Sequence, residues 1–374
     1  MDWTRRAFLT TSAGGLAGLS GCTGGLGRQR PDCFHARTTD ERIGFVGDVM
    51  LGRRVTERWA DRDPAGVWGS TLDRLQELDG LCLNLECCLS NRGQQWPDKT
   101  FYFRADPEFA VPALERIDTS LVALANNHVL DYREPALADT LAHLDDAGLT
   151  HAGAGPDLDR ALDPAITDVG ECTVAMVSFT DRFSEYAAGT DSPGTAYTRF
   201  DPTHVPTRVL VGKSLDRAAA VDPDLVVASL HWGPNWETAP GETQRAFARW
   251  LVDRGVDVVH GHSAHVLQGV EVYEGRPIIY DAGDFVDDYT PKDELHNKRS
   301  ALFELGIVDG ELGELRVIPV EIENEAARLA DGDVARWVRD TVDQRSSRFE
   351  TRTERVDDGL SIPLGSCETA TGRQ

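Results

Sequence analysis

Apolar positions recur along this chain in short runs that predict alternating strands and helices. From residue 43 onward, runs of strand character are separated by stretches with helical spacing. The runs that we interpret as strands are residues 43–47, 81–85, 120–125, 173–179, 225–230 and 256–260. Alternation of this kind is typical of an α/β domain whose sheets are covered by helices.

Two helices are indicated by apolar residues that return to one face. In residues 241–254, Phe247, Trp250 and Leu251 stand at positions i, i+3 and i+4, and a glycine follows the segment. Residues 135–147 carry a similar pattern of leucines and are also followed by a glycine. We expect both helices to cover a sheet.

Closely spaced strands replace this alternation after residue 269. The apolar runs are residues 270–273, 277–280, 301–308 and 315–320. They are joined by Gly-containing turns and predict hairpins that close a second sheet. We expect residues 41–322 to form the domain, and residues 323–374 to form an amphipathic helix and a mobile polar tail.

The first residues predict export and membrane anchoring. Arg5 and Arg6 precede a mildly apolar, glycine-rich run that ends in Leu-Ser-Gly-Cys. This order is typical of a twin-arginine signal with a lipobox, in which Cys22 is lipid-modified. We therefore expect residues 1–22 to be the signal, residues 23–40 a flexible tether, and the protein to be lipid-anchored on the outer face of the cell membrane. An ordinary cytoplasmic amphipathic start is the alternative.

Acidic residues strongly outnumber basic ones. The chain has 62 Asp and Glu against 38 Lys and Arg, and its net charge is -24. This balance excludes nucleic-acid binding through a basic groove and is typical of the carboxylate-rich surfaces of salt-adapted, halophile-like proteins. The chain contains no CxxC pair, which excludes a zinc ribbon, while the even number of cysteines after Cys22 permits disulfides without establishing any.

Side chains that can bind metals follow five of the predicted strands. They are Asp48, Glu86, the triplet Asn126-Asn127-His128, His231, and the pair His262 and His265. Taken singly, each has an ordinary explanation as a helix cap or a packing residue. Because ligands of open α/β sheets bind beyond the carboxyl ends of the strands, we expect these side chains to converge on one crevice.

A mixed set of carboxylate, amide and imidazole donors suits a divalent cation such as Mn²⁺, Fe²⁺ or Zn²⁺. Two ions about 3.5–4 Å apart can hold both the attacking and the leaving oxygen of an ester. A bound cation also lowers the pKa of water enough to supply hydroxide at neutral pH. The sequence therefore predicts a hydrolase-type site with one or two metal ions.

Five motifs occur in a specific order along the chain. They are Gly47-Asp48-Val49-Met50-Leu51-Gly52-Arg53, Asn84-Leu85-Glu86, Leu124-Ala125-Asn126-Asn127-His128-Val129-Leu130-Asp131, Leu230-His231-Trp232-Gly233 and Gly261-His262-Ser263-Ala264-His265-Val266. Together they resemble the CapA (PgsA) capsule-synthesis family, which is associated with the surface polymer poly-γ-glutamate and is related in fold to calcineurin-like metallophosphoesterases. The resemblance covers residues 43–308 and implies a metallophosphoesterase-like four-layer αββα sandwich.

The resemblance also implies roles for individual residues. The candidate metal ligands are Asp48, Glu86, Asn127, His231, His262 and His265. Asp48 and His128 would act in catalysis, His128 by stabilising or protonating the leaving group. Lys99 and Asn84 would contact an anionic substrate group, although a solvated loop lysine is an equal alternative for Lys99.

The chain departs from the family pattern at several positions. Met50 stands where calcineurin-like enzymes have a ligand histidine, and the additional His260 leaves open whether it replaces that imidazole. Asp281 and Asp284 lie in a segment where the family tends to have Ser-Leu-Gly-Asn-Phe. The acidic bias of the whole chain explains these two aspartates more simply than a role as extra ligands.

Three functions are compatible with these features. The leading hypothesis is a CapA-like protein that acts in the synthesis, transfer or attachment of an anionic surface polymer or its precursor, beside membrane-embedded polymer synthesis proteins. A secreted metal-dependent phosphoesterase acting on small phosphate esters is the main alternative. The third is a non-catalytic accessory module that holds polymer carboxylates through bound cations.

Overall fold

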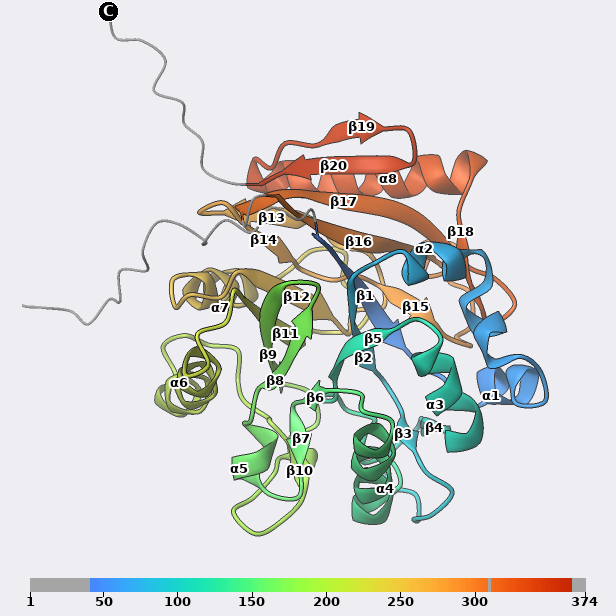
Figure 1. Cartoon of the computed structure of the whole chain (residues 1–374), viewed down its shortest axis with the longest axis vertical. Coiled ribbons are helices and arrows are strands. Elements are labelled where there is room, and N and C mark those ends of the chain that lie inside the picture. Colours follow the sequence, from blue (N-terminus) through green and yellow to red (C-terminus); the bar gives the residue numbers. More distant parts are fainter. Residues whose placement is uncertain (1–40, 309–310, 365–374) are drawn as a thin grey trace, which may run out of the picture. The chain divides into compact units, whose positions relative to one another are not determined.

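Two β-sheets that pack face to face organise the domain (Figure 1). The computed structural model describes residues 41–308 and 311–364. The predicted signal, the lipidated Cys22 and the tether lie outside these residues. Contacts place all the described residues in one unit.

The first sheet has ten strands and mixes parallel and antiparallel pairs. Along its main path the order is β19-β20-β17-β16-β1-β2-β5-β6, with β15 beside β1 and β18 beside β17. The strands are β1 (Glu41–Val49), β2 (Gly80–Leu85), β5 (Thr119–Ala123), β6 (His151–Ala152), β15 (Asp284–Val286), β16 (Arg299–Val308), β17 (Glu311–Ile322), β18 (Ala327–Leu329), β19 (Glu354–Val356) and β20 (Gly359–Pro363). Strands β1, β2, β5 and β6 run parallel, so their carboxyl ends lie at one edge.

The second sheet has six strands in the order β13-β14-β12-β11-β9-β8. The strands are β8 (Ala165–Val169), β9 (Cys172–Thr180), β11 (Leu225–His231), β12 (Val258–His262), β13 (Val270–Tyr273) and β14 (Arg276–Ile279). Its four central strands are parallel. Two small ribbons pair β3 (Cys88–Leu89) with β4 (Arg104–Ala105) and β7 (Ala154–Gly155) with β10 (Gly194–Thr195).

The alternation of side chains along each strand separates the layers. On β1, Phe45 faces the other sheet and belongs to a buried cluster shared by both sheets, whereas Val46 belongs to the cluster on the opposite face. On β9, Met176 likewise joins the cluster between the sheets, and Val177 faces outward. Burying one such side chain contributes roughly 1.5–3 kcal/mol. The strands are apolar on both faces because both faces are covered.

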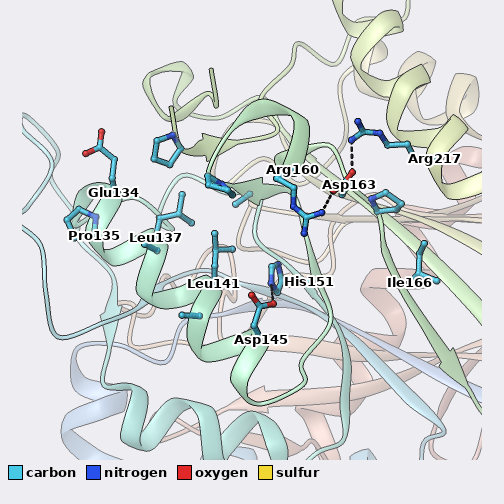
Figure 2. A pocket seen from close by; sticks show the side chains of 16 residues that line it. Glu134, Pro135, Leu137, Leu141, Asp145, His151, Arg160, Asp163, Ile166 and Arg217 are labelled. Carbon is cyan, nitrogen blue, oxygen red and sulfur yellow. Dashed lines mark hydrogen bonds and ion pairs between the residues drawn. The ribbon is translucent and has the colours of Figure 1, made fainter. Parts of the chain in front are cut away.

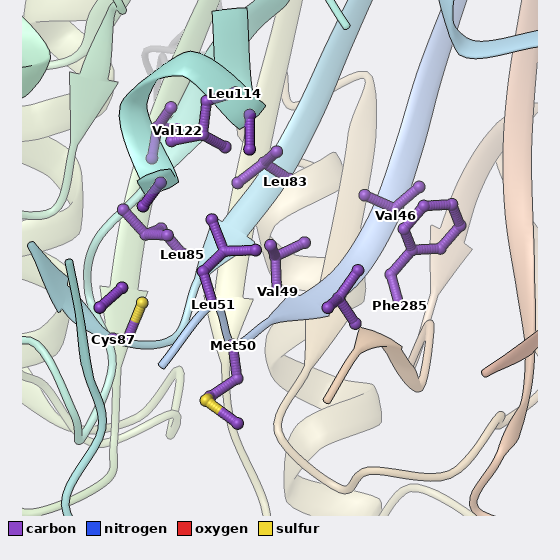
Figure 3. Packing of buried hydrophobic residues seen from close by; sticks show 14 of the residues in the cluster. Val46, Val49, Met50, Leu51, Leu83, Leu85, Cys87, Leu114, Val122 and Phe285 are labelled. Carbon is purple, nitrogen blue, oxygen red and sulfur yellow. The ribbon is translucent and has the colours of Figure 1, made fainter. Parts of the chain in front are cut away.

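Helices cover the outer face of each sheet. The first sheet is covered by α1 (Arg54–Trp59), η1 (Pro64–Thr71), α2 (Leu72–Gln76), α3 (Pro107–Glu115) and α4 (Arg133–Asp146). Figure 3 shows this packing around Leu83, Leu114 and Val122. The second sheet is covered by α5 (Leu158–Ala161), α6 (Val205–Ala219) and α7 (Glu242–Val252). The expected four-layer αββα sandwich is therefore confirmed.

The C-terminal segment contributes more structure than its polar composition indicates. Helix α8 (Gly332–Ser346) packs against the sheets and inserts Val338 and Val342 into the cluster between them. Where we expected a polar tail, β19 and β20 extend the first sheet, because Leu360 and Ile362 alternate into the core. Short 3₁₀ turns complete the described elements, η2 (Ser184–Tyr186) and η3 (Ser347–Phe349).

The two C-terminal hairpins lie in different sheets, which corrects the single second sheet that we expected for them. The β13–β14 hairpin extends the second sheet next to β12. The β16–β17 hairpin belongs to the first sheet, where Phe303 pairs with Phe45 of β1. Local turn signals identify a hairpin but carry no information about which sheet edge it joins.

Candidate metal centre

The carboxyl ends of strands from both sheets meet at one buried site. Asp48 lies near the end of β1, and Glu86 directly follows β2. His231 and His262 are the last residues of the neighbouring strands β11 and β12 and pair in register. Their Nδ1 atoms are 2.9 Å apart, and all four side chains are at most 1% exposed.

Asp48 is the centre of this arrangement. Its Oδ1 accepts a hydrogen bond of 2.7 Å from Asn84 Nδ2 and lies 3.4 Å from His262 Nδ1. Its Oδ2 accepts from the backbone N–H of Ser263 and lies 3.3 Å from His265 Nδ1. Burial alone raises the pKa of the Asp48 carboxyl, but its histidine neighbours outweigh burial and lower this pKa well below its usual value.

Two groups of side chains at this site have the composition of metal sites. Asp48, His231 and His262 form one group, and Asp48, Glu86, His265 and Asp284 form the other. Within each group one ligand atom of every residue lies within 4.8 Å of the others. Glu86 Oε1 and Asp284 Oδ2 are buried and have no hydrogen-bond partner, although His231 Nε2 lies 3.6 Å from Glu86 Oε1. Buried carboxylate oxygens are normally satisfied, so these two are free to bind a ligand. These buried acidic and imidazole groups can hold a metal ion.

Asn127 and His128 lie on the turn after β5 and point to the same site. Asn127 Oδ1 is 2.7 Å from His231 Nε2. His128 Nε2 is 3.9 Å from Glu86 Oε1, and its Nδ1 is 2.6 Å from Asp131 Oδ2. Burial lowers the pKa of His128 to about 4 despite the opposing effect of Asp131, so the imidazole is neutral at pH 7.

Comparison of the sequence with models of protein families connects this domain to a known family. Residues 42–289 match the model of the family described as bacterial capsule synthesis protein PGA_cap. The chain belongs to this family. The match spans β1 to the segment after β15 and therefore includes both groups of side chains described above.

Several named relatives match most of the chain. A probable polyglutamine synthesis accessory protein of Mycobacterium tuberculosis is 35% identical over 344 residues, which is 85% of this chain and 88% of the relative. The capsule biosynthesis protein CapA of Bacillus anthracis is 30% identical over 77% of this chain and 69% of its own length. The PGA biosynthesis protein CapA of Bacillus subtilis is 28% identical over 74% of this chain and 70% of its own length.

A solved structure gives a more distant comparison. A hypothetical protein of Thermus thermophilus covers 75% of this chain and 100% of its own chain, with a TM-score of 0.45 and 17% sequence identity.

The loop that carries Lys99 packs against the Asn127 turn of this PGA_cap domain. The Lys99 side chain is 7% exposed, and its ammonium contacts the Asn127 carbonyl, Asp131 Oδ1 and Tyr186 OH. Burial lowers the pKa of Lys99, and Asp131 opposes this shift. Lys99 thus lies beside the site, where three acceptors already occupy its donors. This arrangement favours a role in positioning the turn. Direct contact with substrate stays a prediction.

Asn84 is likewise engaged within the site. Its Nδ2 donates to Asp48, and its Oδ1 accepts a hydrogen bond of 3.1 Å from Asn126. Asn126 Oδ1 in turn accepts from the backbone N–H groups of His128 and Val129. Asn84 and Asn126 therefore form a buried amide relay that fixes Asp48 relative to the His128 turn, and the predicted substrate contact of Asn84 is untested.

Two positions that sequence reasoning left ambiguous have defined environments. His260 lies between the sheets, where its Nε2 donates to the Val46 carbonyl at 2.9 Å, and it belongs to neither candidate metal group. Met50 is buried in the outer apolar cluster (Figure 3). The side chain at position 50 therefore packs in the core rather than in the metal centre.

Asp281 and Asp284 are not surface products of acidic bias, which corrects our expectation. Asp281 is buried and accepts from the backbone N–H groups of Ala264 and Gly283, so it shapes the loop between His262 and His265. Asp284 belongs directly to the second candidate group. In the sequence, only one feature pointed to a role for these two aspartates in the site. They stand in the segment where the family tends to have Ser-Leu-Gly-Asn-Phe.

A groove lies along α4, away from the residues of the candidate metal centre. It has a volume of about 1140 Å³ and is bordered by Leu137, Leu141 and Ile166. Arg160 and Arg217, which both form ion pairs with Asp163, also border it (Figure 2). None of the predicted ligands lines it. Its size therefore gives no reason to move the candidate site from the buried cluster at the strand ends.

Proposed function

We propose that this PGA_cap protein acts in the synthesis, transfer or attachment of an anionic capsule polymer such as poly-γ-glutamate, through a metal-dependent hydrolase-type site centred on Asp48. The observation that carries the proposal is the convergence of carboxylates and imidazoles from both sheets, with buried oxygens that have no partner. Membership of the capsule family supports the polymer as the biological context.

The donor set fits one or two divalent cations, with Mn²⁺, Fe²⁺ and Zn²⁺ as the candidates. Such a cation would act as a Lewis acid on an ester or amide link and would lower the pKa of water. Asp48, Glu86 and the histidines would hold it. Because these groups are already fixed by hydrogen bonds, little reorganisation would accompany binding.

His128 is suited to move a proton beside this centre. Its Nδ1 donates to Asp131, which fixes the tautomer and leaves Nε2 as the acceptor. The ring stacks on Phe103 with a centroid separation of 3.7 Å, and Nε2 is directed toward Glu86. A neutral imidazole held in this way can take up a proton at Nε2 and return it to a leaving group.

Cationic and aromatic side chains next to the site support an anionic substrate. The ring of Trp236 is 5.2 Å from that of His265, and Lys292 Nζ lies 4.8 Å from the centre of the Trp236 ring. Arg182 donates to Asn235, the neighbour of Trp236. In a chain with a net charge of -24, these cations would favour the approach of an anionic group to this position.

Metal analysis followed by hydrolysis assays tests the proposal. We expect purified protein to contain a divalent metal and to cleave poly-γ-glutamate or a linked precursor. His231→Ala should lose metal and activity, whereas His143→Ala, a change on α4, should keep both. Full metal content and activity in His231→Ala would refute the site.

The same assays separate the alternatives. Turnover of a generic phosphodiester without turnover of the polymer would indicate a secreted phosphoesterase. Bound metal without any turnover, together with loss of surface polymer on deletion, would indicate an accessory role, which is the word used for the Mycobacterium tuberculosis relative.

We also propose that the protein is exported by the twin-arginine route and anchored through Cys22 beside membrane-embedded polymer synthesis proteins. The supporting feature is the N-terminal sequence. Among the described residues, no helix is long and apolar enough to cross a membrane. Cys22→Ser should release the protein into the medium, and continued membrane association of that variant would contradict the lipid anchor.

A further inference from the structure

The two candidate metal groups differ in their donor chemistry although they share Asp48. The imidazole-rich subsite (Asp48, His231, His262) has two imidazoles and one carboxylate. The carboxylate-rich subsite (Asp48, Glu86, His265, Asp284) has three carboxylates and one imidazole. Resting on the metal-dependent function proposed above, we propose that the carboxylate-rich subsite is a separate site for a hard divalent cation, Mn²⁺ or Mg²⁺, and that Asp284 completes it.

Backbone pairing between strands places Asp284 in the carboxylate-rich subsite. Strand β15 runs parallel to β1, and Asp284 is the register partner of Asp48. The N–H of Asp48 donates to the Gly283 carbonyl at 3.0 Å. A Cβ at Gly47 would stand 1.8 Å from the same carbonyl oxygen, so this approach requires glycine. Asp284 is therefore held beside Asp48 by the fold itself and not by a mobile loop.

The charge balance of the carboxylate-rich subsite calls for a cation. Asp48, Glu86 and Asp284 are each at most 1% exposed. His265 Nδ1 lies 2.8 Å from Asp284 Oδ1 and supplies at most one positive charge. The hydroxyl of Tyr289, which donates to Glu86 Oε2, adds none. Asp48 also lies near His231 and His262, and Glu86 lies near His231 and His128. Within the subsite itself, however, three buried carboxylates have a single imidazole, and a divalent cation would balance the negative charge that remains.

The unpartnered oxygens point to the same ligand. Glu86 Oε1 and Asp284 Oδ2 make no hydrogen bond despite their burial. Buried carboxylate oxygens are normally satisfied, and oxygen donors in this number are those preferred by Mn²⁺ and Mg²⁺. The imidazole-rich subsite suits a softer ion such as Zn²⁺ or Co²⁺, so the two positions should select different metals.

A metal titration with matched variants tests this assignment. Chelator-treated full-length protein is titrated with Mn²⁺, with the free ion followed by electron paramagnetic resonance and the bound ions counted by native mass spectrometry. Asp284→Asn should weaken Mn²⁺ binding at one position by at least about 10-fold. The Co²⁺ absorption spectrum of the imidazole-rich subsite should be unchanged. Asp287→Asn is the control, because Asp287 is also a buried aspartate with one unpartnered oxygen but lies outside both groups.

Thermal melting gives a second readout. The direction in which Asp284→Asn changes the melting temperature distinguishes a metal ligand from a structural residue. Without metal, Asp284→Asn should melt at or above the temperature of the wild type, because one buried repulsive charge has been removed. With Mn²⁺ it should gain less than the wild type. A variant that melts lower in both conditions would identify Asp284 as merely structural and overturn the proposal.

The failures of the two proposals are distinguishable. Wild-type Mn²⁺ stoichiometry and affinity in Asp284→Asn, together with a normal Co²⁺ spectrum, would overturn the carboxylate-rich subsite and leave the proposed function intact. A wild-type protein that binds neither Mn²⁺ nor Co²⁺ would overturn both.

Discussion

Replacing Asp131 by Asn tests how the turn beside the metal centre is held. Asp131 Oδ2 accepts from His128 Nδ1 and from the Phe103 N–H, each at 2.6 Å. Its Oδ1 accepts from Tyr186 OH at 2.9 Å and from the ammonium of Lys99. The substitution keeps the shape of the side chain and removes only its charge and one acceptor, so no cavity contributes to the result.

The expected loss of stability follows from the burial of this ion pair. The variant leaves a Lys99 side chain that is 7% exposed without its carboxylate, and the new amide N–H₂ faces existing donors. Removing one partner of a buried pair costs about 3–5 kcal/mol. This is a large part of the roughly 5–15 kcal/mol that stabilises a domain. Urea unfolding followed by circular dichroism measures the change in the free energy of unfolding.

Two comparisons make the result decisive. Asp139→Asn removes the charge of an aspartate that pairs with Arg92, whose side chain is 68% exposed, so its effect should be several-fold smaller. The double variant Lys99→Met/Asp131→Asn should recover part of the loss, because the uncompensated ammonium is gone. If Asp131→Asn were no less stable than Asp139→Asn, or if the double variant were the least stable of all, the argument from a buried charge pair would be refuted.

Further predictions concern the metal, the backbone and the thiols. Chelation should lower the melting temperature, because a cation present at 100 times its Kd stabilises the folded state by about 2.7 kcal/mol; an unchanged melting curve would argue against resident metal. Gly47→Ala should destabilise the protein by about 1–3 kcal/mol or more in urea unfolding, since its Cβ would collide with the Gly283 carbonyl, and stability equal to wild type would contradict the β1–β15 pairing. Burial raises the pKa of Cys82 and raises that of Cys87 to about 12, so iodoacetamide at pH 8 should modify neither thiol until urea is added, as peptide mass spectrometry would report.

The sequence predicted the residues of the site better than their grouping. Asp48, His231 and His262 could be found because each follows an apolar run, and the ends of parallel strands share an edge. The separation into two subsites could not be read, because it depends on which side chains from different sheets face each other. Their role as ligands stays a prediction, whereas their proximity is a property of the fold.

Asp284 and the last strands show why other features were missed. Strand β15 has only three residues, and it pairs with β1, which is distant in the sequence. No local sequence pattern therefore predicts this strand. Strands β19 and β20 are only three and five residues long, and only the alternation of Leu360 and Ile362 marks a half-buried strand. Such strands owe their conformation to tertiary pairing more than to local propensity.

The candidate metal centre draws on both sheets, and under the proposed function this arrangement sets the stage of maturation at which a cation would bind. Asp48 and Glu86 come from one sheet, and His231 and His262 come from the other. Neither candidate group is contained in one short peptide, unlike the ligands of the compact modules in which zinc initiates folding. Cation loading should therefore be a late step that locks two layers already docked, and a chain that loses its ion should loosen first along the seam between them.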